Sequence, residues 1–275
     1  MTLFKIPIII AVPSLAVSIV SITTGYLFLS SPNFQDIRTT TANNSTTGAQ
    51  LKPVKAPAED KLQPSVDSGL PVPLPPDYTI PPITNGLAPL LINIPTKQNV
   101  VFLGIDDGVY KQATELQLMK KNNIKASLFL ADIFIRDNPA FFKKFISAGS
   151  YVENHTINHK LLSRLSYEEQ KQEICLEADR QQLEYGRRPV LFRPPGGDYN
   201  QNTQRAAAAC GMKAVILWIA KANGGSMQYQ VGNKLQPGDI VLMHFRPEFA
   251  ADMKAFIAAE KAAGLRTALL EDWIE

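Results

Sequence analysis

The chain has 275 residues, 45% of them hydrophobic, so it is long enough to bury a substantial core in one large or two small domains. The 28 Lys and Arg against 25 Asp and Glu give a net charge of +3, which is too small to predict a nucleic-acid-binding surface. Two cysteines exclude a small disulfide-rich scaffold.

The first predicted element is an apolar segment within residues 1–30. Residues 6–29 contain no acidic or basic side chain and would span roughly 36 Å as a helix, enough to cross a bilayer. Lys5 and the amino terminus favour an orientation with the N-terminus inside. A cleaved signal peptide is the alternative, although the run is longer than usual and no Ala-x-Ala site follows. Both interpretations place the rest of the chain outside the cytoplasm.

Residues 31–83 are rich in Ser, Thr, Asn and Pro and contain few apolar residues. No helical or alternating pattern predicts a small folded domain here. The segment is typical of a disordered linker, with a Pro-rich second half that should be extended and semi-rigid.

Residues 84–275 alternate short apolar runs with amphipathic stretches and are predicted to form the folded domain. Buried strands are expected at residues 100–105, 126–130, 151–155, 191–193, 212–218 and 239–244. Helices are expected at residues 112–122, 139–148, 166–185, 201–210 and 247–263. This order predicts an α/β fold with a parallel sheet, either open or closed into a barrel.

The two cysteines, Cys175 and Cys210, fall in predicted helices that flank the same strand. In an exported protein they could form a disulfide, if the helix faces bring them within bonding distance. Two buried free thiols are the alternative, and the sequence leaves both open.

Polar residues that could support chemistry stand at or just beyond the ends of predicted strands. Because the carboxyl ends of parallel strands meet at one rim, these side chains should converge there. They are Asp106, Asp107, His155, His159, Arg193 and His244. Each motif alone is a weak signal, since an Asp pair before Gly is more often a turn and a single His more often a packed side chain. Their joint placement is the strong signal.

Two imidazoles separated by three residues can bind one metal ion, with one carboxylate as the third protein ligand and water completing the set. The sequence HTINH, residues 155–159, lacks the Glu of the HExxH zinc-protease motif, so the base must lie elsewhere. One carboxylate of the Asp106–Asp107 pair could bind the cation while the other, held by Arg193, takes a proton from the attacking water. The cation and the arginine would offset the repulsion between adjacent carboxylates.

With these motifs in order, residues 98–275 resemble the polysaccharide deacetylases, the fourth family of carbohydrate esterases. The matching motifs are GIDDG at 104–108, HTINH at 155–159, RPPGG at 193–197 and LMH at 242–244. The resemblance implies a distorted (β/α)7 barrel with a groove, which removes N-acetyl or O-acetyl groups from a sugar polymer.

The resemblance also implies residue roles. Asp106 is similar to the general base, and His244 to the acid that protonates the leaving group. The cofactor would be one divalent metal ion held by Asp107, His155 and His159, with zinc expected first and cobalt, nickel or iron as alternatives.

The remaining roles concern the substrate. The Gly196 N–H would donate to the oxyanion, Leu242 would line the acetyl pocket, and Pro194 belongs to the same substrate-binding loop. Arg193 would hold the base.

The fourth motif of the family departs from its pattern in WIAKANGGS, residues 218–226. Lys221 takes the position of an Asp that orients the acid histidine, and Gly224 and Gly225 take that of an Asp-Trp pair. The support for His244 is therefore missing or comes from elsewhere, which should lower its pKa and weaken it as an acid near neutral pH. The glycines suggest a wider cleft.

The sequence favours a membrane-tethered hydrolase acting outside the cytoplasm on an acetylated cell-envelope polysaccharide, peptidoglycan or a chitin-like N-acetylglucosamine polymer. An enzyme for soluble chitooligosaccharides or acetylxylan is a second possibility. The alternative from another class is a non-catalytic or weakly active glycan-binding domain with a degenerate fourth motif. No nucleic-acid partner is expected, and a monomer is the default.

Overall fold

The computed structural model describes residues 75–274. The predicted N-terminal segment and most of the predicted linker lie outside this range. Within it, no helix is both long and apolar enough to cross a bilayer. Contacts with the domain extend to residues 75–83, which the sequence analysis places in the linker. Asp77 accepts a hydrogen bond from Thr96 Oγ1 at 2.5 Å, and Tyr78 and Ile80 pack against the core.

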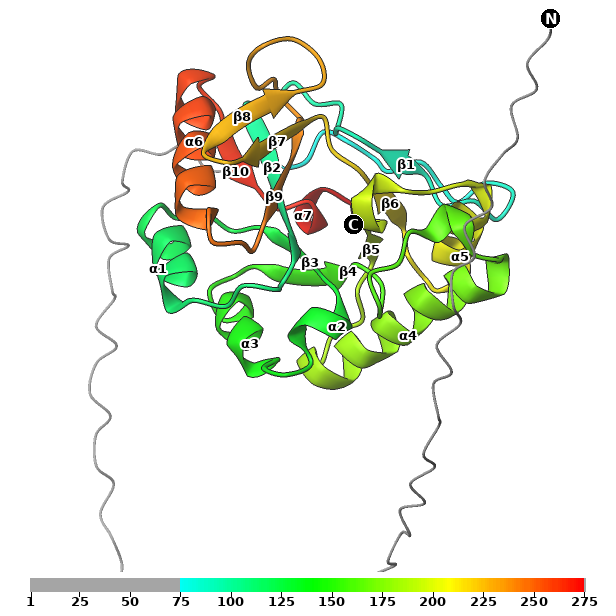
Figure 1. Ribbon diagram of the computed structural model, residues 1–275. Coiled ribbons are helices and arrows are strands. Elements are labelled where there is room, and N and C mark those ends of the chain that lie inside the picture. The colour runs from blue at the N-terminus through cyan, green and yellow to red at the C-terminus, as the bar shows by residue number, and fades with distance from the viewer. Residues whose placement is uncertain (1–74, 275) are drawn as a thin grey trace, which may run out of the picture. The chain divides into compact units, whose positions relative to one another are not determined.

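One curved sheet organises the domain (Figure 1). Its path is β1-β6-β5-β4-β3-β2-β9-β7-β8, with β10 pairing separately with β2, and all neighbours are parallel except β7 and β8. The strands are β1 Leu90–Leu91, β2 Val100–Asp107, β3 Ser127–Leu130, β4 Tyr151–Asn154, β5 Leu191–Phe192, β6 Ala214–Ile216, β7 Ala220–Asn223, β8 Ser226–Tyr229, β9 Ile240–His244 and β10 Arg266–Ala268.

The sheet is an open, mixed half-barrel rather than the seven-stranded barrel that the resemblance implied. Its path ends at β1 on one side and at β8 on the other, with no pairing between these two strands in residues 75–274. The six predicted strands are all present. The strands β1, β7, β8 and β10 were not predicted. All four are short, and β7, β8 and β10 also lack a continuous apolar run.

The five predicted helices are present within two residues at each end. The helices are α1 Ala113–Lys121, α2 Asp132–Ile135, α3 Ala140–Ile146, α4 Tyr167–Tyr185, α5 Gln201–Ala209, α6 Phe249–Ala262 and α7 Glu271–Ile274, with 3-10 turns at Leu162–Arg164 and Pro195–Gly197. Helix α4 begins at a capping box, in which Glu169 accepts a hydrogen bond from the Ser166 N–H at 2.9 Å.

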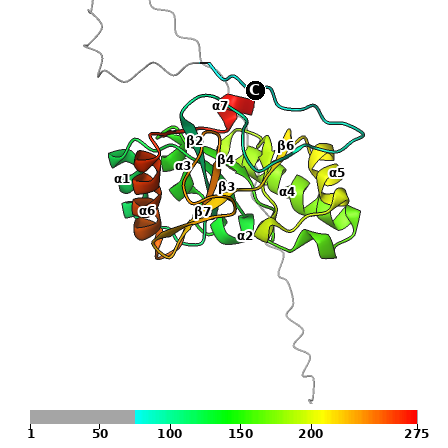
Figure 2. The same cartoon turned by 90° about the horizontal axis from the view of Figure 1, so that it is seen from above.

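Both faces of the sheet are covered, which explains the continuous apolar runs of its strands. On the outer face, Val101, Leu103 and Ile105 of β2 share a cluster with side chains of α1, α3 and α6. A second outer cluster joins α4 and α5 to β5 and β6. Inside the curve, Phe102 packs edge-on against Trp273 of α7. Figure 2 shows the helices around the sheet.

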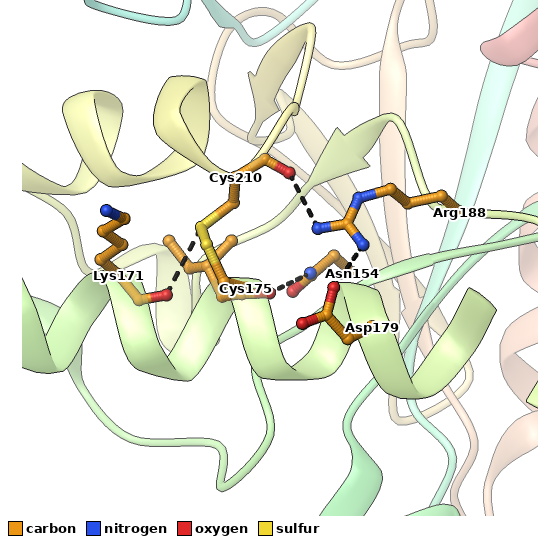
Figure 3. The surroundings of a disulfide bond; sticks show 7 residues. Asn154, Lys171, Cys175, Asp179, Arg188 and Cys210 are labelled. Carbon is orange, nitrogen blue, oxygen red and sulfur yellow. Dashed lines mark hydrogen bonds and ion pairs between the residues drawn. A yellow bond between two sulfur atoms is a disulfide. The ribbon is translucent and has the colours of Figure 1, made fainter. Parts of the chain in front are cut away.

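Cys175 and Cys210 form a disulfide between α4 and the end of α5 (Figure 3). Arg188 reinforces this junction by pairing with Asp179 and donating to the Cys210 carbonyl oxygen. The bond resolves the alternative left open by the sequence, and it ties together two helices that cover one half of the sheet.

Reduction of this disulfide is expected to lower the free energy of unfolding by about 3–4 kcal/mol, because it releases a cross-link between residues 35 apart in the sequence. Urea denaturation with and without a thiol reductant measures the change. A variant with both cysteines replaced by Ser should not respond to reductant. Equal stability of the oxidised and reduced wild type would contradict this expectation.

A buried carboxyl pair lies between α7 and the sheet. Glu271 accepts from Ser127 Oγ at 2.9 Å, while its Oε1 has no hydrogen-bond partner among residues 75–274. Glu153 is fully buried and accepts from Arg187 at 2.8 Å and from the Leu191 N–H at 2.7 Å. Burial, and then the charge of Glu153, raises the pKa of Glu271 to about 8. The folded protein therefore keeps Glu271 protonated at neutral pH.

This proton makes stability fall as pH rises. The unfolded chain releases it near pH 4.5, whereas the folded protein holds it to about pH 8. Glu271→Gln has no proton to lose, so the stability difference between pH 5 and pH 8 should shrink by roughly 3–4 kcal/mol. Urea denaturation at the two pH values tests this, with the exposed neighbour Asp272→Asn as control. Unchanged pH dependence in Glu271→Gln would refute it.

Candidate active site

The polar residues predicted to converge do meet at the carboxyl ends of the strands. Asp106 and Asp107 end β2, His155 follows β4, Arg193 follows β5, and His244 ends β9. In the parallel pairing of β2 with β9, Asp106 is the direct partner of His244. A cluster assembled from four separate strands is thus held by the sheet itself.

Asp107, His155 and His159 form the tightest group. The Asp107 Oδ1 lies 3.1 Å from His159 Nε2 and 3.5 Å from His155 Nε2, and one ligand atom of each residue lies within 4.8 Å of the others. His155 Nδ1 is 2.7 Å from the Arg193 carbonyl oxygen, so it donates there, and this contact orients Nε2 toward the carboxylate. Two imidazole nitrogens and a carboxylate are a donor set that suits zinc and related divalent ions.

Backbone geometry explains how two adjacent aspartates serve one centre. Successive side chains of a strand point to opposite faces, so Asp106 and Asp107 would normally diverge. Asp107 has φ 76°, in the left-handed region that Asp tolerates better than most residues. This break at the strand end turns the second carboxylate toward the imidazoles.

The charge of Asp107 is strongly favoured. Burial acts to raise its pKa, but hydrogen bonds from His155 and His159 outweigh burial and hold the pKa below its usual range. Asp107 is thus ionised at every pH at which the protein would work, as a metal-binding carboxylate must be.

Asp106 is held by a buried arginine. Arg193 is 0% exposed, and its Nη1 lies 2.6 Å from Asp106 Oδ1. The guanidinium stacks 4.1 Å from the centre of the Phe129 ring, and its Nε donates to the Ile216 carbonyl oxygen at 3.3 Å. Arg193 therefore offsets the repulsion between the two aspartates and fixes the orientation of Asp106.

Gly104 makes room for this arginine, a role that the sequence analysis missed. A Cβ at Gly104 would lie 2.4 Å from Nη1 of Arg193, so any larger residue must displace the guanidinium. The available signal was a glycine inside an otherwise β-branched strand, which often marks a close approach.

Glu173 of α4 holds the loop that carries both histidines, and the sequence analysis missed it too. Its side chain is 3% exposed, and its carboxylate accepts from the Asn158 N–H and Nδ2, both at 2.9 Å, and pairs with Lys160 at 2.9 Å. Its carbonyl oxygen accepts from the Ile157 N–H at 3.0 Å. These contacts stabilise a loop in which His159 has φ 55°.

Comparison with known proteins gives the same assignment as the motifs. The profile "Polysaccharide deacetylase" matches residues 93–215. A peptidoglycan-N-acetylglucosamine deacetylase of Bacillus cereus is 30% identical over 55% of this chain and 75% of its own length. The chain belongs to the polysaccharide deacetylase family.

Solved structures share the fold of this polysaccharide deacetylase. One is a peptidoglycan N-acetylglucosamine deacetylase, with a TM-score of 0.59 and 22% identity over 68% of this chain and 93% of the other. Another is a pseudoenzyme of the same family from Bacillus anthracis, with a TM-score of 0.56 and 20% identity over 67% of this chain and 68% of the other. At these identities the likeness concerns the fold alone.

His244 of this polysaccharide deacetylase lacks the orienting carboxylate, as the missing fourth motif predicts. Within residues 75–274, no side chain forms a hydrogen bond with its ring. Burial lowers the pKa of His244, against the opposing charges of Asp106 and Asp107. The direction is the predicted one, but the leading cause is burial. Lys221 is the sheet partner of Leu242, so its side chain lies on the same face of the sheet as the side chains of Leu242 and His244.

Gly224 and Gly225 have a structural explanation that needs no widened cleft. They occupy the two central positions of the β7–β8 hairpin turn, with φ 61° and 76°, between the paired residues Asn223 and Ser226. The Gly225 N–H also donates to Asp252 of α6 at 2.7 Å. Glycine is favoured here by the turn.

Two of the predicted substrate-binding residues are close in sequence to residues of the cluster, Pro194 next to Arg193 and Leu242 two residues before His244. Pro194 and Leu242 are buried, and Leu242 is the sheet partner of Gly104. In the RPPGG loop, the turn bonds use the N–H groups of Gly197 and Asp198. The N–H of Gly196 is outside these two bonds, in a residue with φ 64°.

Proposed function

We propose that this chain is a metal-dependent hydrolase that removes N-acetyl, or O-acetyl, groups from a cell-envelope polysaccharide, peptidoglycan or a chitin-like N-acetylglucosamine polymer. The observation that carries the proposal is the cluster of Asp107, His155 and His159 beside an aspartate fixed by a buried arginine. The Bacillus cereus relative is a peptidoglycan-N-acetylglucosamine deacetylase, which supports the substrate class.

Each catalytic role follows from position. Asp107, His155 and His159 would hold the ion, zinc before cobalt, nickel or iron; when bound, it supplies Lewis-acid activation of water and of the acetyl carbonyl. Asp106, held in place by its ion pair with Arg193, takes the proton of the attacking water.

Groups at the ends of two other strands, β9 and β5, would act on the leaving group and on the carbonyl oxygen. His244, the sheet partner of Asp106, donates a proton to the departing amine or alcohol. The Gly196 N–H donates to the developing oxyanion, Pro194 shapes its loop, and Leu242 contacts the acetyl methyl. The lowered pKa of His244 means that less of it is protonated at neutral pH, so turnover should be slow there or favour acidic pH.

Action outside the cytoplasm is part of the proposal. The disulfide between Cys175 and Cys210 is typical of an oxidising compartment, and the relatives include peptidoglycan deacetylases. We propose a catalytic domain at 84–275, a linker at 31–83 whose last residues, 75–83, pack against the domain, and an anchor or signal segment at 1–30.

Metal removal tests the proposal. A zinc chelator is expected to lower acetate release from N-acetylated peptidoglycan fragments at least tenfold, and added zinc or cobalt should restore it, because the ion supplies Lewis-acid activation that the protein groups lack. The melting temperature gives an independent measure: zinc should raise it in the wild type and not in His159→Gln. Acetate release that is indifferent to chelation would overturn the metal assignment.

A non-catalytic or weakly active glycan-binding domain is the second candidate. It is favoured by the unsupported His244 and by Lys221 in place of an acid, and a family member of the same fold is a pseudoenzyme. Binding of the polymer without acetate release in the presence of zinc would establish it.

A further inference from the structure

We propose that Arg246 selects an acetylated amino sugar that carries a carboxylate, by binding that carboxylate at the mouth of the site. This inference rests on the proposed function and names its substrate class. Arg246 was not among the residues singled out in the sequence, and none of the catalytic roles uses it.

Hydrogen bonds of the neighbouring backbone fix where Arg246 lies, whereas its side chain is partly exposed to solvent. The preceding residue, Phe245, donates its N–H to the Asp106 carbonyl oxygen at 3.2 Å and accepts from the Tyr110 N–H at 3.2 Å. The backbone is thus pinned beside the end of β2, two residues after His244. The side chain itself is 44% exposed.

The contacts of the Arg246 guanidinium are weak. Its Nη2 is 3.9 Å from Asp107 Oδ2, beyond hydrogen-bond distance, and its Nη1 is 3.5 Å from Asn223 Oδ1. Asp107 is the carboxylate that would bind the metal, so an ion there competes with this pairing. A guanidinium presents five donors in a planar fork, most of which remain available to a ligand.

Charge balance favours an anionic ligand. Asp106 and Asp107 carry two negative charges, and Arg193 and Arg246 carry two positive charges, so these four groups cancel. A divalent ion in the site leaves an excess of two positive charges. A carboxylate on the substrate would reduce this excess and could accept a bidentate pair from Arg246.

Two exposed side chains that can pack against sugar rings lie in the loops that follow β4 and β5. Leu161 and Tyr199 are 42% and 37% exposed, and a Cβ at Gly196 would lie 3.4 Å from Leu161 Cδ2. Arg246 follows β9 and contacts Asn223 of β7, on the other side of β2 in the sheet order. A sugar that packs against the loops after β4 and β5 would therefore direct its carboxylate toward β9.

Matched substrates test this specificity. The full-length protein is assayed with N-acetylmuramic acid-containing glycan fragments, either with free carboxylates or with the same carboxylates converted to amides. The wild type should show a kcat/KM about tenfold or more higher for the free acid. Arg246→Gln should remove most of this preference while leaving the amide substrate within about threefold. Arg246→Lys should keep part of it, and Arg205→Gln on α5, an exposed arginine, should keep all of it.

Two results would overturn the inference: no preference in the wild type, or an equal loss on both substrates in Arg246→Gln. If neither substrate releases acetate, the proposed function fails, and calorimetric binding of the same two glycans decides the inference separately. Tighter binding of the free acid by wild type but not by Arg246→Gln would support it. Equal affinities in the wild type would overturn it.

Discussion

Asp106→Asn is expected to lower kcat for acetate release by on the order of 10³-fold, because the asparagine cannot take a proton from the attacking water. Metal content should stay unchanged, since Asp106 is outside the Asp107, His155 and His159 group. Acetate release under saturating substrate, together with metal analysis of the same sample, measures both. A variant that retains more than a tenth of wild-type kcat would exclude Asp106 as the base.

The same substitution leaves the fully buried Arg193 without its counter-charge, which should cost roughly 3–5 kcal/mol of stability. Adding Arg193→Met removes the unpaired charge, so the double variant should regain stability and remain inactive. Recovery of activity in the double variant would show that the single variant was inactive through unfolding alone. Asp137→Asn removes the exposed partner of Lys111 and should change neither stability nor activity appreciably, because an exposed carboxylate is well solvated without its partner.

Gly104→Ala is expected to have the second largest effect, although it adds one methyl group and removes no functional atom. Its Cβ would lie 2.4 Å from Nη1 of Arg193 in the fully buried layer between Phe129 and β2. The guanidinium must move, and its hydrogen bond to Asp106 with it. We expect a loss of about 2–4 kcal/mol in stability from overpacking and the weakened ion pair. Activity should fall at least tenfold, because the base is no longer oriented.

A second glycine serves as the control for Gly104→Ala. Gly211 has φ 86°, and a Cβ at this position would have no described atom within 4 Å. Its replacement by Ala therefore costs only backbone strain, about 1 kcal/mol, and should leave kcat unchanged. Urea denaturation and acetate release on both variants give the comparison. If Gly104→Ala retained normal kcat, the position of Arg193 would not matter for catalysis.

Most of the fold and the centre of the site could be predicted from local patterns. Strands such as 100–105 and 239–244 are continuous apolar runs because helices cover one face of the sheet and α7 with its core cluster covers the other. Residue type and position at strand ends were enough to bring His155, His159 and the Asp106–Asp107 pair together as candidates, while the choice of Asp107 as the metal ligand came from the family resemblance. A strand end has a defined place in a parallel sheet, and this is why a one-dimensional pattern could locate a three-dimensional cluster.

Local patterns determined which chemistry-bearing side chains the chain has and at which strand ends they lie. Only the tertiary structure decided how those side chains are held. The need for glycine at position 104 depends on Arg193, and Arg193 meets Asp106 across 87 residues of sequence. Three further features depend on contacts between separate elements. They are the hydrogen bonds by which Glu173 holds the histidine loop, the approach of Arg246 to Asp107, and the curvature that leaves the sheet open. Such contacts leave no periodic signal, because side-chain periodicity reports which face of an element is buried and not which partner covers it.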